Sequence, residues 1–481
     1  MCRRCSGARG EASGESVGAD RPARADVRCV RVGICDAAAT ADEDEDVKRF
    51  VAIAVVAACV PSRSELRAPV DDVIARDFGS AHVDVSALLA QPLDEAAAVR
   101  VALATNARLA AVLDELGVAG GELAAALGLG PLEVDGMFRF GNGGSHEFEI
   151  DAIQPVLALV TAPRRRAAAR ADLDAARARA SELAIALAAR VEIAMHDVIA
   201  AQQDIELRRT AFDAADAAAT LRERMFAAGN TTELAVARDR DAREQTRIDL
   251  ARAQAAVEAR REALIALLGL SGDRTSFTIV GTLADVPDTT PSLDDLEASA
   301  VAASFALRAG RAHGAAAENR AGAERVASVL PELGVGASAI ELDGKLEVGP
   351  AIRLGLPIFD QRAGARAIAD ADADRAGHEL VADAIELRAH ARATRILALE
   401  AYGEARRLHD VVLPLRQQIV DQTLLHYNAM DADPFQLIVA RRELADAGHQ
   451  YLDALRRYAD AMSEVAALRR GANVRPDVDL P

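Results

Sequence analysis

The sequence predicts a mainly α protein with a small β part, built from long antiparallel coiled-coil helices in two internal repeats. Three observations support this prediction: the composition is that of long helices, landmark motifs recur about 200 residues apart, and short stretches of alternating apolar and polar residues lie between helical segments. Ala, Leu, Arg, Glu and Asp dominate long stretches, as they do in coiled coils. Aromatic residues make up only 3% of the chain and Trp is absent, so we do not expect a large core of aromatic side chains.

The repeat is visible in three pairs of landmarks. Leu93-Asp94-Glu95-Ala96 recurs as Leu293-Asp294-Asp295-Leu296, Phe226-Ala227-Ala228-Gly229 as Tyr427-Asn428-Ala429-Met430, and Leu264 with Leu267 as Val465 with Leu468. Each match is weak alone, but the offset is nearly constant. Each copy has the order helix, strand pair, long helix, turn, helix, which indicates one structural plan used twice. We place the copies at 91–290 and 291–471, followed by a C-terminal tail at 472–481.

The helices of the first copy are predicted from an absence of breaking residues. Residues 164–228 contain neither Gly nor Pro and would form a rod of about 100 Å. Val191, Val198 and Ile205 recur every seven residues, a period typical of a left-handed coiled coil. Gly229-Asn230 should then turn the chain into a second helix over 231–268.

The second copy repeats this plan from about 361 to 470. Its turn is expected at Ala429–Pro434, and Pro414 should kink its long helix because proline cannot donate the backbone hydrogen bond.

Four short stretches between the helices predict β-strands. Apolar and polar residues alternate over 132–140 and again after the turn Gly141–Gly144. They also alternate over 333–342 and 346–358, which flank Asp343-Gly344, a favoured hairpin turn. Period-two alternation over about ten residues fits a transmembrane strand, and it also fits a half-buried hairpin of a soluble domain.

The number of strands bears on the oligomeric state. Four strands cannot close a barrel, since about eight are the smallest useful number. Open sheet edges are not tolerated in lipid. Each repeat is therefore expected to contribute two strands to a transmembrane β-barrel shared between chains. Two chains would supply eight strands and three would supply twelve, and the spacing does not choose between them.

The N-terminal region has the pattern of a lipoprotein signal. Lys48 and Arg49 precede an apolar run over 50–58, and Val56-Ala57-Ala58-Cys59 resembles a bacterial lipobox, whose cysteine is acylated. A buried N-terminal strand or helix is the plainer alternative. Signals begin a chain, so we interpret residues 1–46 as a disordered leader from an over-extended start, residues 47–58 as the signal and residues 59–90 as a linker.

The order of these features resembles the TolC-type outer membrane efflux protein family, over about residues 90 to 471. The similar residues are Leu93-Asp94-Glu95-Ala96 with Asn106 and Leu109, Gly355-Leu356-Pro357-Ile358-Phe359-Asp360 with Arg362 and Arg366, and Leu413-Pro414 with Tyr427-Asn428, Leu437, Tyr451, Tyr458 and Leu468. The first strand-to-helix junction is placed at Ala162-Pro163-Arg164, where the pattern is degenerate. Ala107 and Met430 stand where the family usually has Pro and Gly.

The resemblance implies a function as well as a fold. It implies a homotrimer with a twelve-stranded barrel in the bacterial outer membrane and a periplasmic helical tunnel. The partners it implies are a periplasmic adaptor (a membrane fusion protein) and an inner-membrane pump of the RND type, which together form a tripartite efflux or export system. The lipobox resembles that of the lipid-anchored members, in which a palmitate-bearing cysteine, here Cys59, contacts outer-membrane lipid.

The two helical turns are the candidate functional residues. The resemblance makes Gly229, Asn230, Thr231, Met430, Asp431 and Asp433 the tunnel entrance and the adaptor contact. Asp431 and Asp433 could line a cation-selective acidic ring. Asp433 before Pro434 also has the pattern of a helix N-cap, which we rank first for Asp433; for Asp431 both roles stay open.

Other classes of function find little support. The net charge of −18 argues against nucleic acid as a partner. The residues form no pattern typical of a nucleophile, a phosphate loop or a metal site, so neither enzymatic activity nor a cofactor is expected, and His196 is interpreted as a packed or solvated side chain. All five cysteines lie within the first 59 residues, at spacings too irregular for zinc. The alternative to a transport channel is a periplasmic or cytosolic coiled-coil protein with a structural or interaction role.

Overall fold

The computed structural model describes residues 61–79, 83–128, 130–140, 146–329, 332–342, 345–355 and 362–474. The chain divides into two units, Met1–Cys59 and Val60–Pro481, and every described residue belongs to the second. The expected leader, the signal at 47–58 and the lipidation site Cys59 therefore lie outside the described residues.

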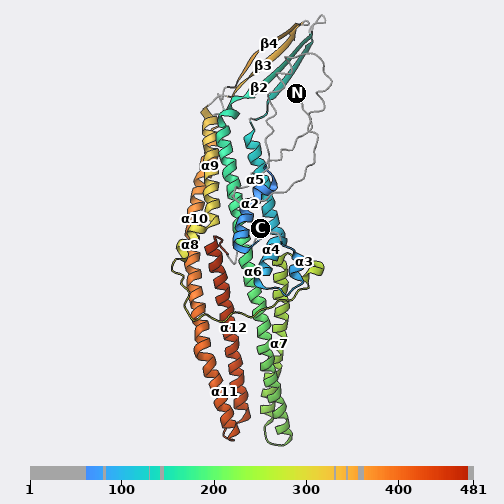
Figure 1. The fold of residues 1–481 in the computed structure, drawn as a ribbon, viewed down its shortest axis with the longest axis vertical. Helices are drawn as coiled ribbons and strands as arrows, with labels where there is room; N and C mark the ends of the chain where they lie inside the picture. Colours follow the sequence, from blue (N-terminus) through green and yellow to red (C-terminus); the bar gives the residue numbers. More distant parts are fainter. Residues whose placement is uncertain are drawn as a thin grey trace, which may run out of the picture. The chain divides into compact units, whose positions relative to one another are not determined.

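Helices dominate the second unit, and its four strands lie at one end (Figure 1). The elements before the first long turn are α2 (Arg63–Phe78), α3 (Val85–Leu89), α4 (Glu95–Thr105), α5 (Ala107–Leu127), β1 (Glu133–Phe140), β2 (His146–Pro155) and α6 (Val156–Ala227). They are followed by α7 (Glu233–Leu268), η1 (Gly272–Thr275), α8 (Leu296–Ala303), α9 (Phe305–Val329), β3 (Glu332–Leu342) and β4 (Lys345–Gly355). The chain then forms α10 (Ala363–Arg407), the π-helical segment η2 (Leu408–Val412), α11 (Leu413–Asn428) and α12 (Pro434–Arg470). This order confirms the predicted mainly α fold with one strand pair in each repeat.

The four strands form one antiparallel sheet in the order β1-β2-β3-β4. The two hairpins pair from Phe140↔His146 and from Leu342↔Lys345, so the four predicted strands are confirmed to within a few residues. β2 and β3 pair from Glu147↔Leu342 to Pro155↔Gly334, which joins the repeats into one sheet. The predicted turns Gly141–Gly144 and Asp343-Gly344 lie outside the described residues.

The predicted junction at Ala162-Pro163-Arg164 is wrong. The strand-to-helix transition occurs eight residues earlier, because β2 stays paired with β3 as far as Pro155, and α6 begins directly afterwards. Pro155 occupies the N-cap position, where its missing N–H costs nothing. Pro163 lies inside α6, where neighbouring Thr161 and Ala162 are buried, so packing outweighs the lost hydrogen bond.

Pro414 interrupts the second long helix as predicted. The π-helical turn η2 lies between α10 and α11, and Pro414 is at the start of α11. A π-turn widens the hydrogen-bonded ring, which accommodates a residue without an N–H. The counterpart α6 runs unbroken over 72 residues.

The main core surrounds the middle of α6. This helix contacts α5, α7, α9 and α12, so it touches helices of both repeats. Leu187, Val191 and Val198 are completely or almost completely buried, whereas Ile205 of the predicted heptad pattern is only partly buried. The segment after α7 closes this core through a short parallel bridge between Leu93 and Ile279.

Among the described helices, no single one is both long and apolar enough to cross a membrane. The pair α4 and α5, bent by 47°, meets this criterion only jointly, by length and composition.

Two glycines close the repeats in the same way. Gly269 ends α7 and Gly471 ends α12, both in the left-handed conformation. A Cβ on Gly269 would lie 2.6 Å from the carbonyl oxygen of Thr105, between α4 and α5, and one on Gly471 would lie 2.4 Å from that of Ala303, between α8 and α9. The equivalent close approach recurs because each hairpin must dock against the break in its short helix pair.

We predict that Gly269→Ala lowers the free energy of unfolding by at least about 1 kcal/mol more than Gly272→Ala does. Both glycines have positive φ, 67° and 63°, but a Cβ at Gly272 meets no atom within 4 Å. Guanidinium unfolding of the purified protein, followed by circular dichroism, measures both values. Equal losses would mean that the docking contact with Thr105 contributes nothing.

Candidate functional site

The sheet has one apolar and one polar face, set by its register. The apolar face carries Val134, Phe138, Phe140, Phe148, Ile150, Ala152, Val335, Ala337, Ala339, Leu346, Val348, Pro350, Ile352 and Leu354. Glu341, opposite Phe148, is the one acidic side chain described on this face. Because the register is continuous from β1 to β4, the alternation of each strand becomes one coherent surface.

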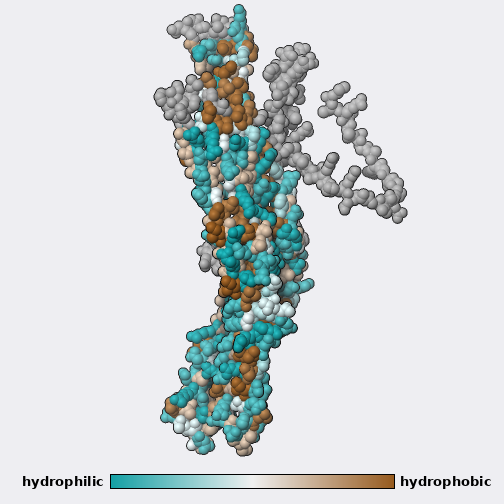
Figure 2. Space-filling model, turned by 90° about the vertical axis from the view of Figure 1, so that its left-hand side faces the viewer, coloured by the Kyte–Doolittle hydropathy of each residue, from teal (hydrophilic) through white to brown (hydrophobic). Residues whose placement is uncertain are grey.

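The apolar face is exposed to solvent within the single chain. Phe140, Leu346 and Ile352 are 81, 70 and 74% exposed, and Phe138 lies against Phe148 with ring centres 4.5 Å apart. Figure 2 shows apolar side chains gathered at the strand end of this unit. An exposed apolar surface of this extent requires an apolar environment or a partner.

The opposite face is mainly polar and acidic. It carries Glu133, Asp135, Arg139, Glu147, Glu149, Asp151, Glu332, Ser338, Lys345, Glu347 and Arg353, with Met137, Ile153, Ile340 and Ala351 among them. Asp135 stands directly opposite Asp151, and Arg353 donates hydrogen bonds to Glu133 and Asp135. Such a face is suited to contact with water.

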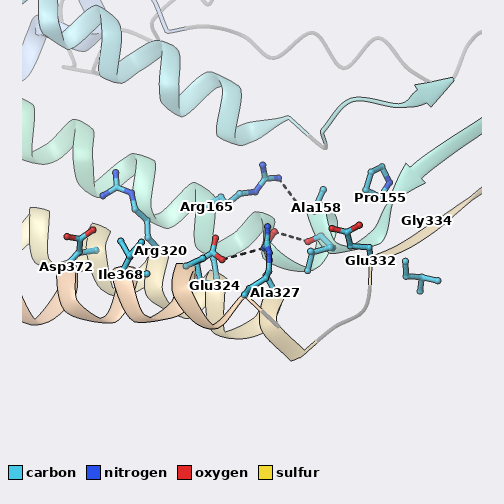
Figure 3. A pocket seen from close by; sticks show the side chains of 18 of the residues that line it. Pro155, Ala158, Arg165, Arg320, Glu324, Ala327, Glu332, Gly334, Ile368 and Asp372 are labelled. Carbon is cyan, nitrogen blue, oxygen red and sulfur yellow. Dashed lines mark hydrogen bonds and ion pairs between the residues drawn. The ribbon is translucent and has the colours of Figure 1, made fainter. Parts of the chain in front are cut away.

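Where the polar face meets α6, α9 and α10, there is a cavity of about 880 Å³ (Figure 3). Ile153, Leu157 and Ile368 contribute apolar wall. The charged lining residues are Glu133, Arg165, Arg320, Glu324, Glu332, Arg353, Arg362, Asp372 and Arg375. The wall thus combines apolar side chains with charges of both signs.

The first predicted turn joins α6 to α7. Gly229 has a φ of +76°, and Asn230 donates its N–H to the carbonyl oxygen of Met225, which closes the end of α6. The side chain of Thr231 lies 3.5 Å from Nη1 of Arg222. The hairpin thus turns where Gly229-Asn230 predicted.

The second predicted turn joins α11 to α12. Met430 has a φ of 60°, where a glycine is favoured, and its side chain is 96% exposed. Oδ2 of Asp431 lies 2.9 Å from Nδ1 of His426, within hydrogen-bonding distance. Asp433 accepts a hydrogen bond from the N–H of Phe435 at 3.0 Å, so its N-cap role is confirmed.

Arg222 connects the two turns, which sequence reasoning did not anticipate. From α6 it donates to Asp239 of α7 at 2.7 Å, and its guanidinium carbon lies 3.1 Å from the ring centre of Phe435 on α12. The Arg222 side chain is only 16% exposed, which strengthens such a cation–π contact. Nothing in the sequence marks Arg222 among 56 Lys and Arg residues, because its role depends on two distant helices.

A charged cluster around the buried His196 joins the repeats near the middle of the unit. His196 of α6 lies 3.1 Å from Asp460 of α12 and 3.7 Å from Glu95 of α4. Burial by itself would lower the pKa of His196, but hydrogen bonds to Asp460 and Glu95 raise it to about 9. Arg456 bridges Asp460 at 2.8 Å and Asp197 at 3.2 Å. His196 is thus a packed cation at neutral pH.

The described residues contain no group of three or more His, Cys, Asp or Glu side chains that could hold a metal ion. The negative charge of the carboxylates around His196 is instead balanced by the protonated His196 and by Arg456.

We predict that the stability difference between the wild type and His196→Gln depends on pH. Because the folded pKa is raised above 6.5, the contribution of protonated His196 is complete below about pH 6.5 and is lost as the pH rises through about 9. A loss on the order of 2–3 kcal/mol is expected across this window. Denaturant titrations at several pH values measure it. A flat profile for His196→Gln across this window would contradict the assignment.

Comparison with known proteins supports the architecture. No protein-family model matches the sequence, and no curated protein matches it significantly. Among solved structures, the outer membrane protein VceC of Vibrio cholerae is similar with a TM-score of 0.64 at 16% identity, over 79% of this chain and 96% of VceC. The outer-membrane channel OprN gives a TM-score of 0.64 at 20% identity, over 78% of this chain and 89% of OprN.

The CmeC outer membrane channel of Campylobacter jejuni is similar as well, with a TM-score of 0.59 at 14% identity, over 80% of this chain and 86% of CmeC. The similarity extends over nearly the whole length of each of these structures, so it includes the strands as well as the long helices. The chain therefore has the TolC-type outer-membrane channel fold, as the sequence resemblance predicted.

Proposed function

We propose that this protein is the outer-membrane channel subunit of a tripartite efflux or export system, passing substrates from a periplasmic adaptor and pump to the exterior. The observation that carries the proposal is the sheet: one face is apolar and exposed, the other is polar and charged, and neither outer edge is paired with another described strand. In a soluble coiled-coil protein such an apolar face would be exposed to water, which is unfavourable.

The open edges require more than one chain. Within a membrane, every backbone N–H and C=O of the sheet must find a partner, which only a closed barrel allows. Three copies would supply twelve strands and two would supply eight; the family resemblance favours the homotrimer. The apolar face would then contact lipid, and the polar face together with the cavity below it would form part of the passage.

The helical hairpins would continue this passage through the periplasm. At their tips, Gly229, Asn230, Thr231, Met430, Asp431 and Asp433 are the proposed tunnel entrance and adaptor contact. The exposure of Met430 supports this role, because an exposed apolar side chain in a strained turn is suited to binding a partner. OprN and CmeC, two of the similar structures, are outer-membrane channels, which agrees with the proposal.

The remaining parts of the chain complete the proposal. Residues 47–58 would direct export, Cys59 would carry the lipid anchor, and residues 91–290 and 291–471 would be the two repeats that build the duct. The mass of the N-terminal peptide of the purified protein tests the anchor: an unmodified Cys59, or any peptide from residues 1–46, contradicts this part alone.

The channel role predicts a membrane-bound, heat-modifiable oligomer with conductance. The expressed protein should sediment with outer membranes and run as an oligomer in detergent gels until it is boiled. Reconstituted in a planar bilayer, it should give stepwise currents. A soluble, monomeric protein without conductance would favour the coiled-coil alternative.

A second prediction concerns the entrance. If Asp431 lines an acidic ring, Asp431→Asn should shift the reversal potential in a KCl gradient towards lower cation selectivity. Asp433→Asn keeps the turn folded, because asparagine also caps helices, and it should leave the selectivity unchanged if Asp433 only caps α12. Unchanged selectivity in Asp431→Asn would mean that Asp431 does not line an acidic ring and only contacts His426.

A further inference from the structure

Arg353 makes an unusual contact across the sheet. It belongs to β4, yet its Nη1 donates to Glu133 of β1 at 2.8 Å and its Nη2 donates to Asp135 of β1. β1 and β4 are the two outermost strands, separated by β2 and β3. Three strand spacings amount to about 14 Å in a flat sheet, and side chains stand roughly perpendicular to it. The contact therefore requires a sheet that is curled towards its polar face.

Two glycines of β3 allow this curl. A Cβ on Gly336 would lie 1.9 Å from the carbonyl oxygen of Ala152, and one on Gly334 would lie 2.5 Å from Cγ2 of Ile153. β2 and β3 thus approach more closely here than any side chain would permit, and glycines at such positions are how a sheet acquires sharp curvature. The bend lies at the same end of the strands as Arg353, which pairs with Gly334.

The outer edges of β1 and β4 have no strand partner in the described chain. The three ion-pairing side chains next to these edges are still accessible: Arg353 is 46% exposed, Glu133 48% and Asp135 60%. One cation on one edge and two carboxylates on the other are complementary. Both sets also lie at the same end of the sheet, because β1 starts at Glu133 and β4 ends at Gly355.

We infer that Arg353 joins one copy of this chain to the next: on assembly it exchanges Glu133 and Asp135 of its own β1 for the same residues of a neighbouring copy. The inference rests on the proposed function, because β4 meets a second β1 only if copies share a barrel. The contact within one chain keeps the two edges curled together before assembly, when an open edge would pair indiscriminately. After assembly, the same charges fix the position at which β4 and the neighbouring β1 meet, since a register slip would separate them.

Charge reversal with mixed chains tests the exchange. Arg353→Glu alone and Glu133→Lys/Asp135→Lys alone both place like charges at every junction, so each should lose most of its heat-modifiable oligomer. When the two variants are co-expressed, a junction between unlike chains is complementary, while the pair within each chain remains broken. In a mixed trimer two of the three junctions are of this kind. An affinity tag on the Arg353→Glu chain should therefore recover the untagged lysine chain in an oligomer band that is partly restored compared with either variant alone. The triple variant that combines all three substitutions should also restore the oligomer.

A matched control lies within the first hairpin, where Arg139 pairs with Glu147 at 3.1 Å. β1 and β2 pair within one chain, so co-expression of Arg139→Glu with Glu147→Lys should give no rescue beyond the separate variants. An Arg353→Glu chain that oligomerises like the wild type overturns the inference. So does rescue by the triple variant without rescue by mixing, which would confine the ion pair to one chain. A monomeric wild type would contradict the proposed function as well as this inference. The wild-type lane of the gel shows that outcome without any variant.

Discussion

Backbone hydrogen bonding at the edges of the sheet is the constraint on which the rest of this structure depends. The outer edges of β1 and β4 carry rows of N–H and C=O groups that no described strand pairs. In water such edges are solvated, but next to an apolar face they attract any other strand. In lipid they are prohibitively costly. In the proposed channel, copies of the chain would complete this surface for one another.

The helical part of the molecule holds that sheet in place. β2 continues directly into α6 through Pro155, and α6 contacts helices of both repeats. The packing relies on small residues, with Ala180, Ala184 and Ala188 completely buried on α6, so that helix backbones approach closely. Gly269 and Gly471 dock the two hairpins in the same manner, which keeps the long arms aligned relative to the strands.

Charge has different roles along the chain. In the middle, His196 and Arg456 neutralise carboxylates that are exposed or only partly buried, and they connect α4, α6 and α12. Breaking one partner of such a cluster is costly, because a buried charge is left uncompensated. On the polar face of the sheet and in the cavity below it, the ion pairs are exposed and contribute little stability each. Their value there is to keep a surface hydrated and to position neighbouring strands.

The sequence by itself determined the element types. The Gly- and Pro-free stretch predicted α6, Gly229-Asn230 and Ala429–Pro434 predicted the turns, and alternation predicted the four strands, because these signals act over a few neighbouring residues. Tertiary structure decided the rest. The helix start at Val156 depends on pairing with β3, the contacts of Arg222, His196 and Arg353 join residues far apart in the chain, and the curl depends on how closely β2 approaches Gly336. No local pattern contains such information, since the free energy of each contact exists only once the distant partner has been brought into place.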